Sequence, residues 1–169
     1  MTRNFALRSL AAGLALAAVV PCALAAGPAL SITEKADLAV PPAKAWDAIR
    51  DFGAWQTWHP VLASDEITKG KDNTKGAVRV LTTKDGGKIT EELTAYSAAG
   101  MTYTYRIIDS PLPVKNYVST LKVAKTKTGS TVTWSGKFDA KDGTADDDAK
   151  KAMTGVYRAG LDNLPNVVK

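Results

Sequence analysis

The 169-residue sequence has a single cysteine, Cys22, and a single histidine, His59. Cys22 lies in an N-terminal stretch that we expect to be removed, so the remaining chain has no thiol. This excludes disulfide bonds, a cysteine nucleophile and cysteine-ligated zinc. One imidazole does not supply the three or four protein ligands of a zinc site, and no cluster of carboxylates accompanies it. The sequence therefore predicts no metal site, no cofactor and no catalytic residues.

The N-terminal apolar segment is too short for a membrane anchor. Two arginines precede residues 10–20, and this apolar run falls short of the roughly 18 residues that a transmembrane helix needs. Small residues follow at 23–27, as at a signal-peptidase site. We therefore expect residues 1–25 to be a secretory signal peptide. Residues 26–169 then form one periplasmic domain, with no membrane span after cleavage.

Positive charge is in only slight excess. The chain has 22 basic and 17 acidic residues, and removal of the two arginines in residues 1–25 leaves 20 against 17, a net charge of +3. This excess is too small to indicate nucleic acid binding. It favours an acidic protein as a partner, because opposite charge speeds association.

Hydropathy patterns predict one strand, a short helix and then a series of strands. Residues 30–40 alternate between apolar and polar side chains, as a half-buried strand does. Pro41 and Pro42 end this strand and begin a helix. Six runs rich in Thr, Val, Ile or Tyr follow, with turn residues between them. These runs are residues 63–70, 76–83, 87–97, 101–109, 116–126 and 130–140.

The C-terminal segment predicts a long amphipathic helix. Apolar residues recur at i, i+3 and i+4 from Ala149 to Leu164, and we expect Pro165 to end the helix. The stretch from Trp55 to Pro60 predicts a second short helix or a tight turn. The whole order predicts an α+β fold, in which a curved antiparallel sheet of about seven strands packs against one long and two short helices.

Specific segments support a family resemblance. "VPPAKAWDAIRDFGAWQTWHP" (40–60), "GAVRVLTTKDGGKITEEL" (76–93) and "YTYRIIDSPLPVKNYVSTLKV" (103–123) resemble the polyketide cyclase/dehydrase-like branch of the START/Bet v 1-like (SRPBCC) superfamily. The resemblance implies a helix-grip fold with a ligand cavity between the sheet and the long helix. The small, exported, basic chain also resembles the MxaD type, periplasmic accessory proteins of bacterial methanol oxidation. That resemblance implies a non-enzymatic protein that assists methanol dehydrogenase and its cytochrome.

Strand alternation identifies the side chains that face such a cavity. Tyr103 and Tyr105 share one face of their strand, and Tyr117 and Trp134 point inward from theirs. Glu91 falls on the apolar face of its own run. We expect these side chains to line a pocket for a small hydrophobic or aromatic ligand. The alternative is a closely packed core.

Arg79 lies in the run before Glu91. If the hairpin register matches, both side chains lie inside, and the ion pair is able to orient a polar ligand group. The alternatives are a pair that only fixes the register, or a one-residue shift that turns Arg79 toward solvent.

Trp58 and His59 belong to "AWQTWHPVL" (54–62), the densest group of rings in the chain. We expect this segment to form a lid over one end of the cavity, with the tryptophans packed and His59 hydrogen-bonded locally. Ligand contact by Trp58 and His59 is an alternative. A third is that His59 acts as a general base on a polyketide.

Three functions are open at this point. The first is an exported, non-enzymatic accessory protein that meets an acidic periplasmic dehydrogenase or cytochrome. The second is a carrier of a small hydrophobic or aromatic ligand in the helix-grip cavity. The third is an enzyme similar to a polyketide cyclase or dehydratase, which export and the lack of a catalytic constellation disfavour.

Overall fold

The computed structural model describes residues 29–168. The segment predicted to be a signal peptide, residues 1–25, lies outside the described residues, and its removal stays a prediction. No helix of the described part is both long and apolar enough to cross a membrane.

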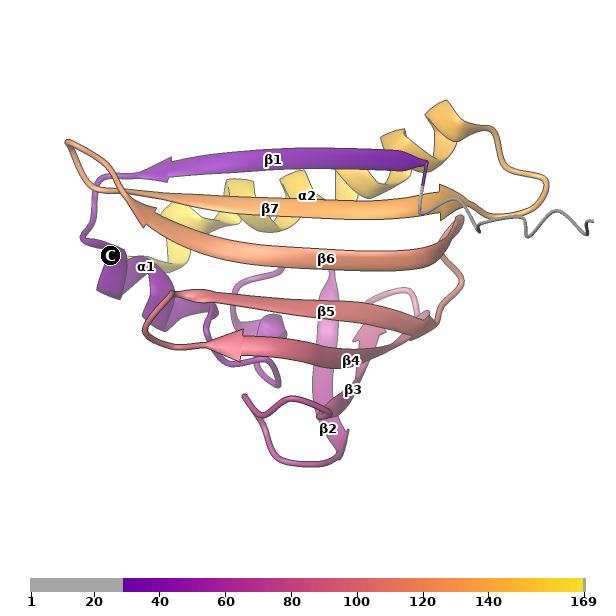
Figure 1. The fold of residues 1–169 in the computed structure, drawn as a ribbon, viewed down its shortest axis with the longest axis horizontal. Coiled ribbons are helices and arrows are strands. Elements are labelled where there is room, and N and C mark those ends of the chain that lie inside the picture. Colours follow the sequence, from indigo (N-terminus) through magenta and orange to yellow (C-terminus); the bar gives the residue numbers. More distant parts are fainter. Residues whose placement is uncertain (1–28, 169) are drawn as a thin grey trace, which may run out of the picture.

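The described residues form one antiparallel sheet with helices on one side (Figure 1). The elements are β1 (Leu30–Leu38), α1 (Pro42–Ile49), the 3-10 helix η1 (Trp55–Thr57), β2 (Leu62–Lys69), β3 (Val78–Thr83), β4 (Lys88–Ser97), β5 (Thr102–Asp109), β6 (Val114–Lys125), β7 (Ser130–Ala140) and α2 (Asp146–Val167). The strand order is β1-β7-β6-β5-β4-β3-β2, so the chain meanders from β2 to β7 and β1 pairs with β7. The predicted α+β helix-grip fold is confirmed.

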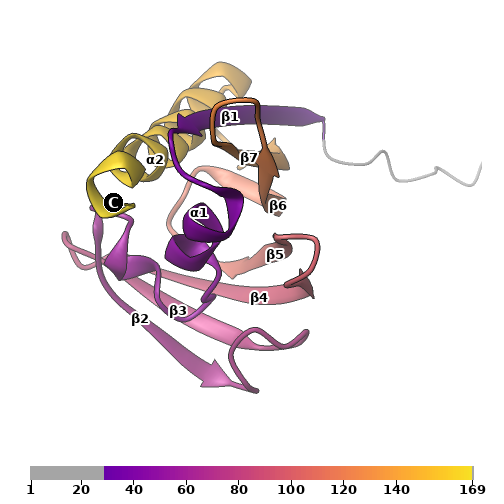
Figure 2. The same ribbon diagram turned by 90° about the vertical axis from the view of Figure 1, so that its left-hand side faces the viewer.

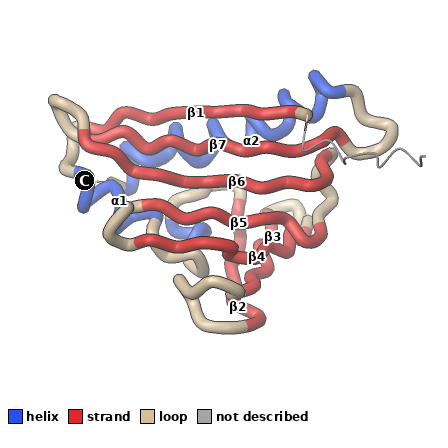
Figure 3. The backbone as a smooth tube through the Cα atoms, in the orientation of Figure 1, coloured by secondary structure: helices blue, strands red, loops and turns tan. Residues whose placement is uncertain are grey.

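The sheet curves strongly, and the helices fill its concave side. Seen end-on in Figure 2, the strands sweep from β1 round to β2, with α1 inside the curve and α2 along its open side. Figure 3 shows β5, β6 and β7 side by side, with β2 and β3 crossing them steeply. Because side chains alternate along each strand, Tyr103, Tyr105 and Leu121 all point into this concave side and are buried.

Strand β6 has a β-bulge against β7 close to the point where its pairing with β5 ends. Pairing between these strands stops at Arg106 and Val118, although β5 stays paired with β4 as far as Asp109. Strand β6 holds one extra residue between Lys115 and Val118, where Asn116 has a φ of 54°. Asparagine is one of the few residues that adopt this left-handed conformation readily. The sheet therefore opens into a slot at this end.

The C-terminal helix ends later than predicted. The sequence places its end at Pro165, but α2 continues to Val167. Pro165 lacks only the amide hydrogen that would bond to the Leu161 carbonyl oxygen, and the Val168 N–H still donates to the Leu164 carbonyl oxygen at 2.9 Å. A proline this close to the C-terminal end of a helix removes one backbone hydrogen bond but still allows the last helical turn to form.

Two glycines of α2 are expected to respond to alanine in opposite ways. A Cβ at Gly155 would meet nothing within 4 Å, whereas a Cβ at Gly160 would lie 2.7 Å from both a Trp58 and a His59 ring carbon. Alanine at Gly155 should raise the free energy of unfolding by about 0.5–1 kcal/mol through helix propensity. Alanine at Gly160 should lower it by about 1–3 kcal/mol through overpacking. Urea denaturation measures both, and a stabilised Gly160→Ala would contradict the close contact.

Candidate ligand-binding site

All eight residues predicted for the site lie in the interior between the sheet and the helices. They are Trp58, His59, Arg79, Glu91, Tyr103, Tyr105, Tyr117 and Trp134, and each is at most 4% exposed. The structure therefore brings together residues from the turn after η1 and from five strands. Their contacts divide them into a buried ion group, a hydroxyl network and a lid.

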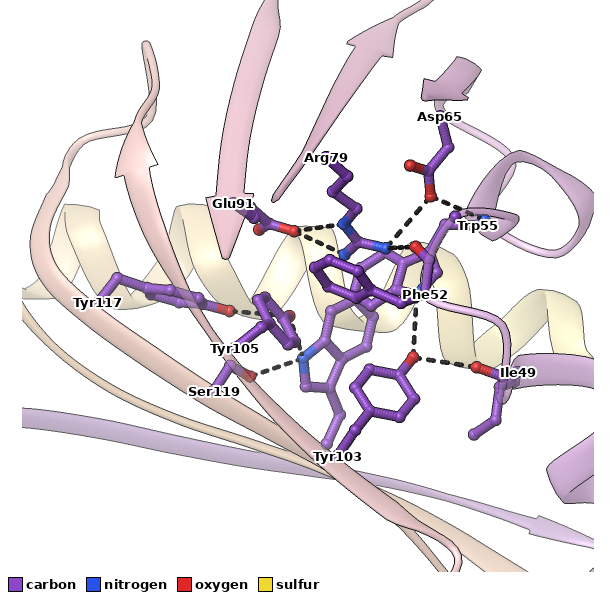
Figure 4. Close-up of polar contacts among 12 residues, drawn as sticks. Ile49, Phe52, Trp55, Asp65, Arg79, Glu91, Tyr103, Tyr105, Tyr117 and Ser119 are labelled. Carbon is purple, nitrogen blue, oxygen red and sulfur yellow. Dashed lines mark hydrogen bonds and ion pairs between the residues drawn. The ribbon is translucent and has the colours of Figure 1, made fainter. Parts of the chain in front are cut away.

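Arg79 is the centre of the buried ion group (Figure 4). It is the register partner of Glu91, so both side chains point inward. Its Nε and Nη2 donate to Glu91 Oε2 at 2.9 Å and 2.6 Å. Its Nη1 contacts Asp65 Oδ2 at 3.2 Å and also donates to the Phe52 carbonyl oxygen. The guanidinium is completely buried, so it depends on these oxygens for its solvation.

Aromatic rings enclose the same guanidinium. The Arg79 Cζ lies 4.0 Å from the Phe52 ring centroid and 3.8 Å from the Trp55 ring centroid, which are cation–π distances. Asp65 Oδ2 also accepts a hydrogen bond from the Trp55 backbone N–H at 3.0 Å. Arg79 therefore holds the segment between α1 and β2 against the sheet.

The ion group has two carboxylates for one guanidinium. Burial raises the pKa of Asp65 to about 6, against the opposing effect of Arg79. Burial likewise raises the pKa of Glu91. Burial disfavours the charge of Arg79, but Glu91 and Asp65 outweigh it, and the pKa of Arg79 lies above its usual value. Burial therefore favours the protonated form of both carboxyl groups, and Arg79 opposes this effect.

A hydroxyl network joins β5, β6, β7 and α2. The Trp134 Nε1 donates to Tyr105 Oη at 3.0 Å and to Ser119 Oγ at 2.9 Å. The Tyr117 and Tyr157 hydroxyl oxygens are 2.6 Å apart. Burial raises the pKa of Tyr157 to about 12 and raises the pKa of Tyr105 and Tyr117 well above the usual value. These hydroxyls stay protonated at neutral pH and act as hydrogen-bonding groups.

Tyr103 connects the sheet to the end of α1. Its hydroxyl accepts a hydrogen bond from Trp55 Nε1 at 2.9 Å and donates to the Ile49 carbonyl oxygen at 3.0 Å. Both hydrogen-bonding directions of this hydroxyl are thereby occupied by the protein. Tyr103 positions neighbouring groups and does not line the cavity described below.

The predicted lid is present, but His59 does not bond locally. Its Nε2 donates to the Val156 carbonyl oxygen of α2 at 3.1 Å, 97 residues away in the chain. Helix α2 packs over the lid, and its backbone is the acceptor within reach. Burial lowers the pKa of His59 to about 4, so the ring is neutral at pH 7. Its Nδ1 and the Trp58 Nε1 are buried without a hydrogen-bond partner among the described residues.

A small cavity of about 80 Å³ lies between the lid, the sheet and α2. Five predicted residues line it: His59, Glu91, Tyr105, Tyr117 and Trp134. Trp55, Thr83 and aliphatic side chains of β2 to β5, α2 and the adjoining turns complete the lining. Three predicted residues, Trp58, Arg79 and Tyr103, do not line it and support those that do. The cavity is therefore mainly apolar, with a few polar atoms.

An open cleft of about 490 Å³ lies at the slot between β5 and β6. Arg106, Lys115 and Lys141 are among the residues that line it. Ile107 and Tyr117 line both this cleft and the interior cavity. These two side chains therefore form a wall shared by the cleft and the cavity.

Sequence reasoning did not identify Asp65, Ser119 or Tyr157 as part of the site. Ser119 lies between Tyr117 and Leu121 on the inward face of β6, and Tyr157 falls on the apolar stripe of α2, so patterns for both were available. Asp65 had no such signal, because a register shift between Leu62 and Ser64 changes which residues of β2 face inward. No three His, Asp or Glu side chains of residues 29–168 gather as a metal site.

Known proteins resemble this chain over most of its length. A family model described as "Polyketide cyclase / dehydrase and lipid transport" matches residues 29–169. No curated protein matches. The solved structure of XoxI from Bacillus cereus is 31% identical, with a TM-score of 0.75, and the match covers 82% of this chain and 94% of XoxI.

Two further structures have the same fold. An uncharacterised protein from Bacillus thuringiensis is also 31% identical with a TM-score of 0.75, and the match covers 82% of this chain and 98% of that one. Ara h 8.0201 is 22% identical with a TM-score of 0.69, and the match covers 82% of this chain and 97% of the other.

Proposed function

Because the chain belongs to the polyketide cyclase/dehydrase and lipid-transport family of the START/Bet v 1-like (SRPBCC) superfamily, we propose that it binds a small, largely apolar ligand without transforming it. The ligand occupies the cavity between the sheet and α2. The predicted signal peptide supports a periplasmic location for this binding.

The cavity is the observation that carries this proposal. Aromatic and aliphatic side chains with a few placed polar groups are typical of ligand sites. Its volume of about 80 Å³ is well below the roughly 300–1,000 Å³ of sites for drug-sized molecules. The expected ligand therefore has only a few non-hydrogen atoms.

The state of the titratable groups favours binding over acid–base catalysis. His59 is neutral and donates its Nε2 hydrogen to Val156, and Arg79 holds Glu91. The tyrosine hydroxyls at the cavity stay protonated because burial raises their pKa. Neither the histidine nor the tyrosines therefore have the near-neutral pKa that suits a general base.

A cavity-filling substitution tests the proposal. Ile89 lines the cavity, whereas Ile108 is 50% exposed on the outer side of β5, so Ile89→Phe and Ile108→Phe make the same change at two sites. Native mass spectrometry of protein released gently from its own host, at low ionic strength, should find a small dissociable mass on the wild type and Ile108→Phe. That mass should be absent from a folded Ile89→Phe. Equal retention by both variants would place the ligand elsewhere.

We also propose a second role, as an accessory protein of periplasmic methanol oxidation that docks on an acidic dehydrogenase or cytochrome. The cleft between β5 and β6 supports it, because exposed Ile108 and Val118 lie there beside Arg106, Lys115 and Lys141. An apolar patch with a basic rim suits an acidic partner. In the same mass spectra, this role predicts a complex with a much larger protein that is lost as salt is raised.

A further inference from the structure

We propose that the cavity selects a cation that donates hydrogen bonds, namely an ammonium group on a short aliphatic body. This inference rests on the proposed function, because it specifies the chemistry of the ligand that the cavity holds. Three features of the cavity support this inference: the carboxyl group that lines it, the unpaired hydrogen-bond acceptors of its lining residues, and the aromatic rings of its walls.

The cavity is lined by the carboxylate of the ion group and not by its guanidinium. Glu91 is among the lining residues, and Arg79 and Asp65 are not. Both hydrogen bonds from Arg79 to Glu91 use Oε2, so Oε1 lies outside the ion pair. A ligand in the cavity therefore meets a carboxylate oxygen, which accepts hydrogen bonds only.

The buried acidic and basic groups are unequal in number. Two carboxyl groups, Asp65 and Glu91, surround one guanidinium, and all three side chains are at most 5% exposed. A cation in the cavity would favour the ionised form of the Glu91 carboxyl group. An anion of the same size would oppose that form in a region that water does not screen.

His59 offers a second acceptor. Because its Nε2 donates to Val156, the neutral ring carries its lone pair on Nδ1. That Nδ1 is buried and has no partner among residues 29–168, and His59 lines the cavity. A buried unpaired acceptor is unfavourable, so a donating ligand that reaches this nitrogen from the cavity would supply the missing hydrogen bond. A ligand with only acceptors gains nothing from either His59 or Glu91.

The walls favour the same class of ligand. The rings of Trp55, Tyr105, Tyr117 and Trp134 line the cavity. Aromatic rings attract ammonium groups through their electron-rich faces, and most strongly where water is excluded. Rings together with one carboxylate distinguish an ammonium from an alcohol, which a purely apolar pocket does not do.

Four probes of equal size test the selection. Isopropylammonium donates and is cationic, 2-propanol donates and is neutral, acetone only accepts, and acetate is anionic. Each is titrated into the wild-type protein, with binding followed by NMR at the four tryptophan indoles and the single imidazole. We expect isopropylammonium to bind about tenfold or more tightly than 2-propanol, as a buried cation–π and carboxylate contact would give. Acetone and acetate should bind more weakly still.

Glu91→Gln and Glu92→Gln make a matched pair of variants. Both remove one carboxylate from adjacent positions of β4, but Glu92 lies on the outer face, where it pairs with the exposed Arg106. Glu91→Gln should abolish the preference for the cation and still bind 2-propanol. Glu92→Gln should keep the full preference. If Glu91→Gln does not fold, the order of affinities of the four probes for the wild type tests the inference without this variant.

The outcomes separate this inference from the proposed function. If 2-propanol or acetone binds as tightly as the cation, the inference is overturned and the cavity remains a ligand site. If no probe shifts the tryptophan or imidazole signals, both fail. Cation binding that Glu92→Gln removes and Glu91→Gln retains would place the site on the outer face and overturn the inference.

Discussion

Arg79→Met is expected to lower the free energy of unfolding by about 3–5 kcal/mol, the usual cost of removing one partner of a buried ion pair. Asp65 and Glu91 would then be buried without their counter-charge, and the Phe52 carbonyl oxygen would lose a donor. The rings that enclose Arg79 would also lose a cation–π contact. Chemical denaturation with tryptophan fluorescence measures the change.

Arg106→Met is the matched control. Arg106 makes a similar contact with Glu92 on the outer face, but its side chain is 52% exposed. Water and salt screen that pair, so the same substitution should cost less than about 1 kcal/mol. Adding Asp65→Asn and Glu91→Gln to Arg79→Met should restore much of the loss, since no uncompensated buried charge is left. A cost for Arg79→Met as small as that expected for Arg106→Met would show that the buried ion group is not needed for stability.

His59→Gln and Asp65→Asn should tilt the pH dependence of stability in opposite directions. Burial lowers the pKa of His59 from 6.5 to about 4, so the unfolded chain binds more protons and stability is lost as the pH falls through this range. Burial raises the pKa of Asp65 from 3.8 to about 6, so stability is lost as the pH rises through that range. Burial of Glu91 acts in the same direction as burial of Asp65.

His59 should offset part of the effect of the carboxyl groups, so the wild type should depend less steeply on pH between 4 and 6 than His59→Gln does. With His59→Gln, the carboxylates act alone, and the free energy of unfolding should fall by about 2–3 kcal/mol from pH 4 to pH 6, at about 1.4 kcal/mol per proton and pH unit. With Asp65→Asn, the slope should shift the other way relative to the wild type, toward a free energy of unfolding that rises with pH. Denaturation series from pH 4 to 7 measure both slopes.

The NMR signal of the single imidazole measures the lowered pKa of His59 independently of the stability measurements. His59 is the only histidine of the chain, so its NMR titration needs no assignment among several rings. Its signal should stay that of the neutral ring down to about pH 4. A midpoint near 6.5 would mean that the ring is solvated and that its contact with α2 is absent.

The fold followed from patterns that are local in the chain. Period-two alternation in the six strand runs and the apolar stripe of the last helix are enough to place inward and outward faces. The inward residues Tyr103, Tyr105, Tyr117 and Trp134 were predicted correctly as interior for this reason. The pairing of Arg79 with Glu91 was open, because it depends on the length and geometry of the turn between β3 and β4.

The contacts that define the site depend on segments far apart in the chain. Asp65 turns inward because of an irregularity in β2 that alternation does not contain. The acceptor for His59 belongs to α2, which packs on the lid only where Gly160 leaves room for its rings. Whether two distant surfaces meet depends on their shapes, which residue types alone do not encode.

Residue types and their spacing were therefore sufficient for the α+β fold and the interior aromatic residues, and the family resemblance added the helix-grip arrangement. The packing of α2 and the lid against the sheet added the rest: a cavity of about 80 Å³ in place of a filled core or a large pocket, and the buried carboxylate that faces it. The physical reason is that the alternation of side chains along one strand determines which residues are buried. The volume of a cavity depends instead on small differences between the volumes of many side chains packed from distant segments.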